Sequence, residues 1–250
     1  MKTIRSIGAS CSLCGCVSIF HRTMVERIIV GPLFTNTYLV ATSKKGCVIV
    51  DPGADVDLIA ARLEAMNMKP HAIVLTHGHL DHTAAAAELK RRFGGIPVCI
   101  HPNDANMLAN ASRREHLESF RGLAERAEEA VDRLLRSLPD PDILLEDGAE
   151  VPDSDLQVIH TPGHTPGSVC FYSEPRGALF SGDTLHLTAG TEGLPGGDRA
   201  QLIASITDRI FPLPGETRLF PGHGPISSIE REMLHNDGLR ETAGRTTREG

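Results

Sequence analysis

The stretch THGHLDH, Thr76–His82, places three histidines and one aspartate within seven residues, directly after the apolar run Ala72–Leu75. That run is too short for a helix, so we expect a buried strand that ends where the polar stretch begins. Imidazole and carboxylate groups are strong ligands for transition metals, and an apolar core does not accept them without partners. The chain must therefore fold so that this turn meets metal ions or other polar side chains.

Short β-branched runs separated by turn residues recur along the chain and predict strands. They lie at Val25–Val30, Thr37–Val40, Cys47–Val50, Ala72–Leu75, Pro97–Ile100, Leu156–Ile159, Val169–Tyr172, Ala178–Phe180 and Arg218–Phe220. Apolar residues at helical spacing predict helices at Asp55–Met68, Thr83–Phe93 and Asp198–Ile210. Two sets of strands, each followed by helices, indicate an α/β chain in which two sheets pack face to face with helices outside.

Length and charge limit the classes of protein that this chain can belong to. Its 250 residues suit one large domain or two small ones. A net charge of −7 and the lack of a basic run disfavour a nucleic-acid partner, which would require a positively charged face. No apolar stretch reaches the ~18 residues that a membrane span needs. We therefore expect a small-molecule substrate.

Residues 1–23 differ from the rest of the chain. They contain CSLCGC, Cys11–Cys16, whose three thiols lack an obvious fourth ligand and so make a weak metal motif. Lys2 and Arg5 precede a short, interrupted apolar stretch, as in a poor signal peptide, and LCGC resembles a lipoprotein cleavage site. We expect a disordered extension before a domain at residues 24–250, and a cytoplasmic protein. Export or lipid anchoring through residues 1–23 is the alternative.

Three further ligand-type residues stand beside glycines, each just after a predicted strand. They are His164 in TPGHTPGS, Asp183 in SGDT and His223 in FPGHGP. Glycine lets the backbone turn sharply and approach closely, so these turns can carry side chains into one site. A lone histidine or aspartate at a strand end is more often structural. Three such placements beside THGHLDH, whose four ligands one metal cannot easily use together, favour a site for two metals.

In this order, THGHLDH, TPGHTPGS, SGDT and PGHGP resemble the motifs of the metallo-β-lactamase superfamily, over roughly Val25 to His235. The resemblance implies a four-layer αββα sandwich with a metal site at one edge. It implies these ligands: His77, His79 and His164 for one ion, Asp81, His82 and His223 for a second, and Asp183 as the bridge between them. Asp51, in IVDPG, matches a family position that orients the metal loop without touching the metal. We expect two divalent ions, zinc first, with iron or manganese as alternatives.

Asp183 narrows the resemblance further. β-Lactamases generally lack the bridging carboxylate, so the chain is most similar to the glyoxalase II branch and its small hydrolase relatives. The segment LPGGD, Leu194–Asp198, strengthens this likeness. Three features depart from glyoxalase II: GTEG at residues 190–193 replaces a Gly-Arg-Thr-Asp run, Gly224 and Pro225 stand where a tyrosine is usual, and only 27 residues follow His223, too few for the helical domain that helps to hold glutathione.

The expected chemistry is hydrolysis by a hydroxide that bridges the metals, because two divalent ions lower the pKa of bound water toward ~7. The hydroxide attacks a carbonyl carbon, and Asp81 and Asp183 are the catalytic candidates beside it. A thiolate leaves more readily than an amine, so thioesters are favoured over amides, with hydroxyacylglutathione hydrolase activity as in glyoxalase II.

Other activities of the same superfamily remain as alternatives. A persulfide dioxygenase uses one iron, held by two histidines and an aspartate, but its last motif usually reads Pro-Ala-His where this chain has Pro-Gly-His. A lactonase carries an extra active-site tyrosine that neither Tyr38 nor Tyr172 clearly matches. An RNA-processing nuclease is disfavoured by the acidic charge.

A helical insert is expected at about residues 103–140. Arg113–Leu138 carries one apolar stripe at helical spacing, as in an amphipathic helix. Such a helix can pack on the outside of the sandwich, cap the metal site, or form the surface of a homodimer.

Overall fold

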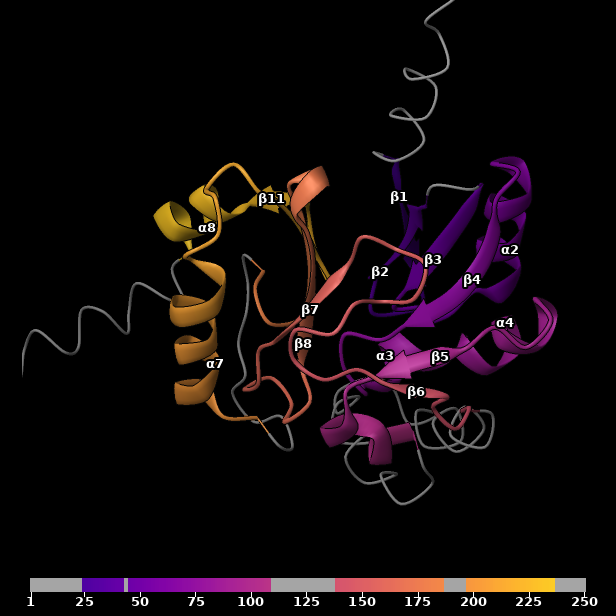
Figure 1. Ribbon diagram of the computed structural model, residues 1–250, viewed down its shortest axis with the longest axis horizontal. Helices are drawn as coiled ribbons and strands as arrows, with labels where there is room; N and C mark the ends of the chain where they lie inside the picture. Colours follow the sequence, from indigo (N-terminus) through magenta and orange to yellow (C-terminus); the bar gives the residue numbers. More distant parts are fainter. Residues whose placement is uncertain (1–23, 43–44, 109–137, 187–196, 237–250) are drawn as a thin grey trace, which may run out of the picture.

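The computed structural model describes residues 24–42, 45–108, 138–186 and 197–236 (Figure 1). The extension at residues 1–23 and nearly all of the amphipathic segment Arg113–Leu138 lie outside the described residues, so those expectations stay predictions. Within the described residues, no helix is long and apolar enough to cross a membrane.

Two mixed sheets form the centre of the molecule. The first has the order β1 (Val25–Val30), β2 (Thr35–Ala41), β3 (Gly46–Val50), β4 (Lys69–Val74), β5 (Val98–Ile100), β6 (Ile143–Leu144). The second has the order β11 (Ser227–Ser228), β10 (Arg218–Pro221), β9 (Ala178–Gly182), β8 (Val169–Ser173), β7 (Gln157–His160). Figure 1 shows the sheets face to face, with helices outside each of them: α2 (Val56–Ala65) and α4 (Ala86–Arg92) beside the first, α7 (Arg199–Ser205) and α8 (Ile229–His235) beside the second. The four-layer αββα sandwich expected from the sequence is confirmed.

Alternation along the strands produces these layers, because neighbouring side chains of a strand point to opposite faces of the sheet. In β2, Leu39 packs in the cluster under α2, whereas Tyr38 and Val40 pack between the sheets. The Tyr38 ring meets the rings of Phe180 and Phe220 from the second sheet edge-on, with centroids 5.4 and 5.5 Å away. These aromatic contacts fix the distance between the two sheets.

The carboxyl ends of the strands bring the polar turns together. β3 and β4 are parallel, so Asp51 and the THGHLDH turn leave the first sheet at the same edge. β9 and β10 are also parallel, and β7 runs with them because β7 and β9 are each antiparallel to β8. The segments that carry His164, Asp183 and His223 therefore leave the second sheet together.

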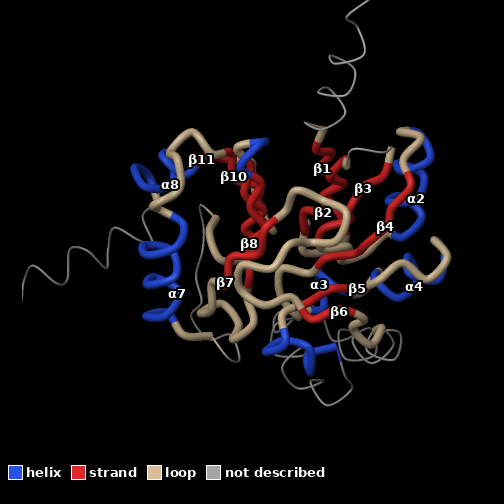
Figure 2. Tube along the Cα trace, in the orientation of Figure 1, coloured by secondary structure: helices blue, strands red, loops and turns tan. Residues whose placement is uncertain are grey.

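The helix expected at Thr83–Phe93 is wrong in its start and its continuity. Two helices occupy this region, α3 (Leu80–Thr83) and α4 (Ala86–Arg92), with a break between them (Figure 2). The amide of Ala85 donates to the carbonyl of Pro52, outside the helix, and this bond draws the break against the Asp-Pro-Gly turn. Asp81 and His82 consequently lie inside a helical turn and not in a loop before one.

Two further helices depart from expectation. The helix expected at Asp55–Met68 is shorter, and Leu58, one of its apolar residues, is 50% exposed, because α2 buries only a narrow stripe against the sheet. The helix expected at Asp198–Ile210 ends as α7 at Ser205 and continues as a π-helical turn, Ile206–Ile210. Sequence patterning also missed the two-residue strands β6 and β11, which are too short to show a period, and helix α8.

Replacing Leu63 by alanine should cost about 2–5 kcal/mol in the free energy of unfolding, because its side chain is fully buried under α2. The matched control is Leu58→Ala on the same helix, which should cost less than about 1 kcal/mol since half of that side chain is already in water. Denaturant unfolding measures both. Equal losses would contradict the orientation of α2.

Candidate metal centre

The turn after β4 is held by a buried carboxylate from the turn after β3. Asp51 Oδ1 accepts the amide of Thr76 at 2.8 Å, and Oδ2 accepts the Thr76 hydroxyl at 2.6 Å. A Cβ atom at Gly53 would overlap the carbonyl oxygen of Asp81, so only glycine lets the Asp-Pro-Gly turn lie against α3. THGHLDH therefore starts from a fixed position.

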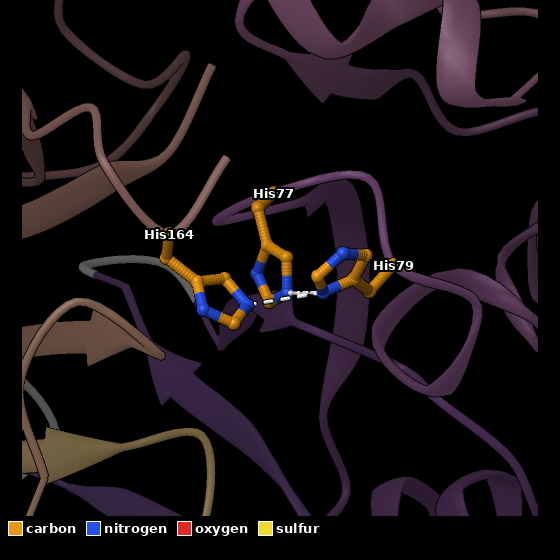
Figure 3. Close-up of side chains that lie close together, drawn as sticks. All are labelled: His77, His79 and His164. Atoms are coloured by element: carbon orange, nitrogen blue, oxygen red, sulfur yellow. Dashed lines mark hydrogen bonds between the residues drawn. The ribbon is translucent and has the colours of Figure 1, made fainter. Parts of the chain in front are cut away.

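Three histidines converge beside this turn. His77 Nε2 and His164 Nε2 each lie 3.0 Å from His79 Nδ1. All three side chains are buried, and Figure 3 shows their rings turned toward one another from two segments of the chain. We refer to His77, His79 and His164 as the three-histidine group.

A second group of donors lies next to the first. His223 Nε2 is 3.2 Å from Asp81 Oδ2 and 3.3 Å from His82 Nε2, and His82 Nε2 is 3.4 Å from Asp81 Oδ2. The group takes Asp81 and His82 from α3 and His223 from the loop after β10, so it spans both sheets. We refer to these three residues as the mixed group.

Asp183 lies between the two groups. Its Oδ2 is 3.5 Å from His164 Nε2 in the first and 3.6 Å from His223 Nε2 in the second, and its Oδ1 is 3.5 Å from His82 Nε2. The structure thus brings together all seven side chains that the sequence singled out as ligands. Asp51 lies behind them, in contact with Thr76 and His82.

Hydrogen bonds on the far side of two rings decide which nitrogen faces the centre. The Thr76 hydroxyl donates to Asp51, so it can only accept from His77, whose Nδ1 lies 3.0 Å away. His82 Nδ1 donates to Asp51 Oδ2 at 3.0 Å. In their neutral forms both rings therefore turn an unprotonated Nε2 inward, which is the form that binds a metal.

The loop after β10 is held in the same way. His223 Nδ1 donates to the carbonyl of Leu33 at 3.2 Å, which leaves Nε2 to face the other donors. The Tyr38 hydroxyl and the Asn36 amide donate to the carbonyl of Pro221, at 2.7 and 2.9 Å. The hairpin of β1 and β2 therefore positions His223 from the opposite sheet.

These supporting residues were missed by sequence reasoning. Thr35, whose hydroxyl donates to Asp81 Oδ2 at 3.1 Å, is 46 residues from its partner, and Asn36 and Tyr38 are more than 180 residues from Pro221. No local motif marks them, since their partners are close only after folding.

Burial and charge set the protonation of the cluster. Burial and the neighbouring His164 lower the pKa of His79 to about 3, and burial also lowers the pKa of His77 and His164. These rings are neutral at neutral pH. Burial opposes protonation of His82 as well, but the Asp81 and Asp183 carboxylates outweigh it and raise the pKa of His82 to about 10. In the absence of a metal, that proton supplies positive charge to the cluster.

The donor set fits divalent transition metals. Among the described residues, three groups of side chains have ligand atoms that lie within 4.8 Å of one another inside the group. They are the three-histidine group, the mixed group, and His77 with His82 and Asp183. Asp183 Oδ1 is buried and accepts no hydrogen bond from the described part of the chain. Such a buried carboxylate oxygen, close to ring nitrogens that can bind a metal, is better satisfied by a cation than by the protein itself.

Comparison with known families decides where the chain belongs. A family model described as the metallo-beta-lactamase superfamily matches residues 30–223. The chain belongs to the metallo-β-lactamase superfamily. Hydroxyacylglutathione hydrolase GloC of Haemophilus influenzae is 31% identical over 216 residues, which cover 86% of this chain and 97% of that protein.

Solved structures of the superfamily share the fold. BLEG-1, a B3 metallo-β-lactamase, has a TM-score of 0.74 at 36% identity over 86% of this chain and 99% of that chain. TTHA1623 in a di-iron-bound form has a TM-score of 0.70 at 35% identity over 84% of this chain and 98% of that chain. Membership of a superfamily of metallo-hydrolases, together with the buried histidines and aspartates, makes this chain an enzyme with a metal site.

Metal affinity should fall as the pH is lowered through the neutral range. With a pKa of about 10, His82 carries a proton on the metal-free protein, and a metal must displace it. Each proton released lowers the apparent affinity about tenfold per pH unit below that pKa. Calorimetric zinc titrations in buffers of different ionisation enthalpy count the protons. An affinity that stays constant with pH would contradict a protonated His82.

Asp51→Asn should weaken metal binding by about 10–100-fold, because an amide has one accepting oxygen, whereas Asp51 accepts the Thr76 amide on Oδ1 and the Thr76 hydroxyl and His82 Nδ1 on Oδ2. Competition with a chelator measures the change. Asp155→Asn is the matched control, since Asp155 is a part-buried carboxylate that accepts from Ser173 and Arg176 away from the cluster. Similar losses in both variants would mean that the effect is general destabilisation.

Proposed function

We propose that this protein is a binuclear metallohydrolase whose substrates are thioesters. The observation that carries the proposal is the position of Asp183 within 3.6 Å of ring nitrogens from both donor groups. The three-histidine group would hold one divalent ion and the mixed group a second, and Asp183 would contact both. Zinc is the first choice from the donor types, and the di-iron form of TTHA1623 supports iron as the alternative.

When bound, the two ions would lower the pKa of a water molecule and polarise the carbonyl oxygen of the substrate. The chain supplies the framework for this chemistry. Asp51 holds the rings of His77 and His82 in the required tautomers, directly and through Thr76, and the carbonyl of Leu33 does so for His223.

The ionised state of Asp81 favours thioesters as substrates. Burial alone would raise the pKa of Asp81, but His82 and His223 beside it hold that pKa well below its usual range. Asp81 is therefore ionised at neutral pH and has no proton to give to a departing group. An amine leaving group needs such a proton, whereas a thiolate departs without one. The similarity to hydroxyacylglutathione hydrolase GloC supports the same substrate class.

β-Lactam hydrolysis is the second candidate, because BLEG-1, a B3 metallo-β-lactamase, matches 86% of this chain at 36% identity. Persulfide oxidation at a single iron and lactone hydrolysis remain further alternatives. These candidate activities differ in the leaving group of the substrate and in the number of bound ions. Both properties can be measured on one preparation.

The purified protein should hold close to two metal ions per chain and hydrolyse thioesters but not β-lactams. The panel comprises S-D-lactoylglutathione, a coenzyme A thioester, an alkyl thioester, a lactone, a β-lactam, and glutathione persulfide with an oxygen electrode. Asp183→Asn should weaken the binding of the second ion and lower the hydrolytic rate, each by at least about 10–100-fold. Asp57→Asn, at an exposed carboxylate on α2, is the control.

Two results would each refute the proposal in a different way. Turnover of glutathione persulfide alone, with oxygen uptake and one iron per chain, would identify the protein as a persulfide dioxygenase. Two bound ions with turnover of β-lactams alone would support the binuclear centre but show that the substrates are β-lactams and not thioesters.

A further inference from the structure

A second buried carboxylate stands behind the three-histidine group. Asp104 lies in the 3-10 helix Pro102–Leu108, which follows β5, and its side chain is fully buried. Its Oδ2 accepts the amide of Gly78 at 3.0 Å and the hydroxyl of Thr165 at 2.6 Å, and its Oδ1 accepts the amide of Gly167 at 2.6 Å. One carboxylate thus joins three segments of the chain.

The partners of Asp104 are placed next to the histidines. Gly78 lies between His77 and His79, and Thr165 directly follows His164. We propose that Asp104 is a positioning residue that sets the geometry of the three-histidine group and raises its affinity for a cation. The inference rests on the proposed function, in which these histidines hold a divalent ion.

Close packing makes Asp104 the fixed point for both loops. A Cβ atom at Gly78 would lie 2.5 Å from Cβ of Met107, one turn along the same 3-10 helix. A Cβ atom at Gly167 would lie 2.6 Å from Cγ of Asp104. Real side chains do not tolerate such distances, so the helix lies directly on the backbone of both loops. Neither loop can shift without breaking a hydrogen bond to Asp104.

The charge of Asp104 also bears on metal binding. All three donors to its carboxylate are neutral groups, so the hydrogen bonds satisfy the oxygens without balancing the charge. Burial raises the pKa of Asp104, and these hydrogen bonds oppose that effect. A divalent ion held by the adjacent histidines would stabilise the anion, and by linkage the anion would stabilise the ion.

Asp104 and Asp51 divide the support of the centre between them. Asp51 contacts Thr76 and His82, at the start of the THGHLDH turn and in the mixed group. Asp104 contacts the middle of the same turn and the loop that carries His164. Loss of Asp104 should therefore affect one metal far more than the other, which a general loss of stability would not do.

The test measures each ion separately. His223→Ala removes a ligand of the mixed group and leaves the three-histidine group, whereas His164→Ala does the reverse. In each background, the affinity for Co²⁺ is measured by its visible absorption and by chelator competition, with and without Asp104→Asn. Thermal unfolding of the metal-free proteins reports on the fold.

Asp104→Asn should weaken the remaining ion by about 10–100-fold in the His223→Ala background and leave it unchanged in the His164→Ala background. Thr165→Val and Thr165→Ser provide a second pair that does not alter Asp104. The valine, which lacks the hydroxyl, should reproduce the selective loss, and the serine, which keeps it, should restore the affinity.

Equal weakening in both backgrounds, or none in either, would overturn the role of Asp104 while leaving a binuclear centre in place. Should Asp104→Asn fail to fold, the Thr165 pair decides, and equal affinities of valine and serine variants would overturn the inference. A wild-type protein that binds no Co²⁺ would instead refute the proposed function, and this inference with it.

Discussion

The polar centre depends on the hydrogen bonds that the carboxylate of Asp51 accepts. Parallel pairing of β3 with β4 places this carboxylate beside Thr76, and the tight turn at Gly53 places it beside α3. From there it binds the backbone and hydroxyl of Thr76 and the ring of His82. Because a carboxylate can only accept, every group that contacts it must donate. In their neutral forms, His82 directly and His77 through Thr76 therefore turn the Nε2 lone pair inward.

That arrangement is costly for the protein alone. His79 Nδ1 lies 3.0 Å from both His77 Nε2 and His164 Nε2 and carries at most one proton, so it can satisfy only one of them. Asp183 Oδ1 accepts no hydrogen bond from the described residues. The rest of the described structure follows ordinary rules, with alternating strands, buried aliphatic side chains and edge-on aromatic pairs. A local departure from those rules inside a regular sandwich is the physical mark of a functional site.

The sequence predicted the parts of this structure that depend on neighbours along the chain. Strand β1 was predicted at its observed bounds, and the candidate ligands could be found because each motif that carries them follows a predicted strand. Prediction failed where tertiary contacts decide. The helix after THGHLDH divides because Ala85 bonds to Pro52, and nothing local to Ala85 signals this. Thr35 and Asp104 were missed for the same reason, since their partners are more than 20 residues away.

Charge balance connects the number of ions to the surroundings of the centre. Asp81 and Asp183 lie among the donors, and the buried carboxyl groups of Asp51 and Asp104 lie behind them, so up to four negative charges gather around the histidines. In the metal-free protein, Asp81 and Asp183 outweigh burial and raise the pKa of His223, and the proton of His82 offsets one of the four charges. Two divalent ions would offset all four and release that proton, whereas one ion would leave half of the charge unbalanced. The buried carboxyl group of Asp51, which contacts His82 of the mixed group, is therefore part of the reason why a second ion should bind.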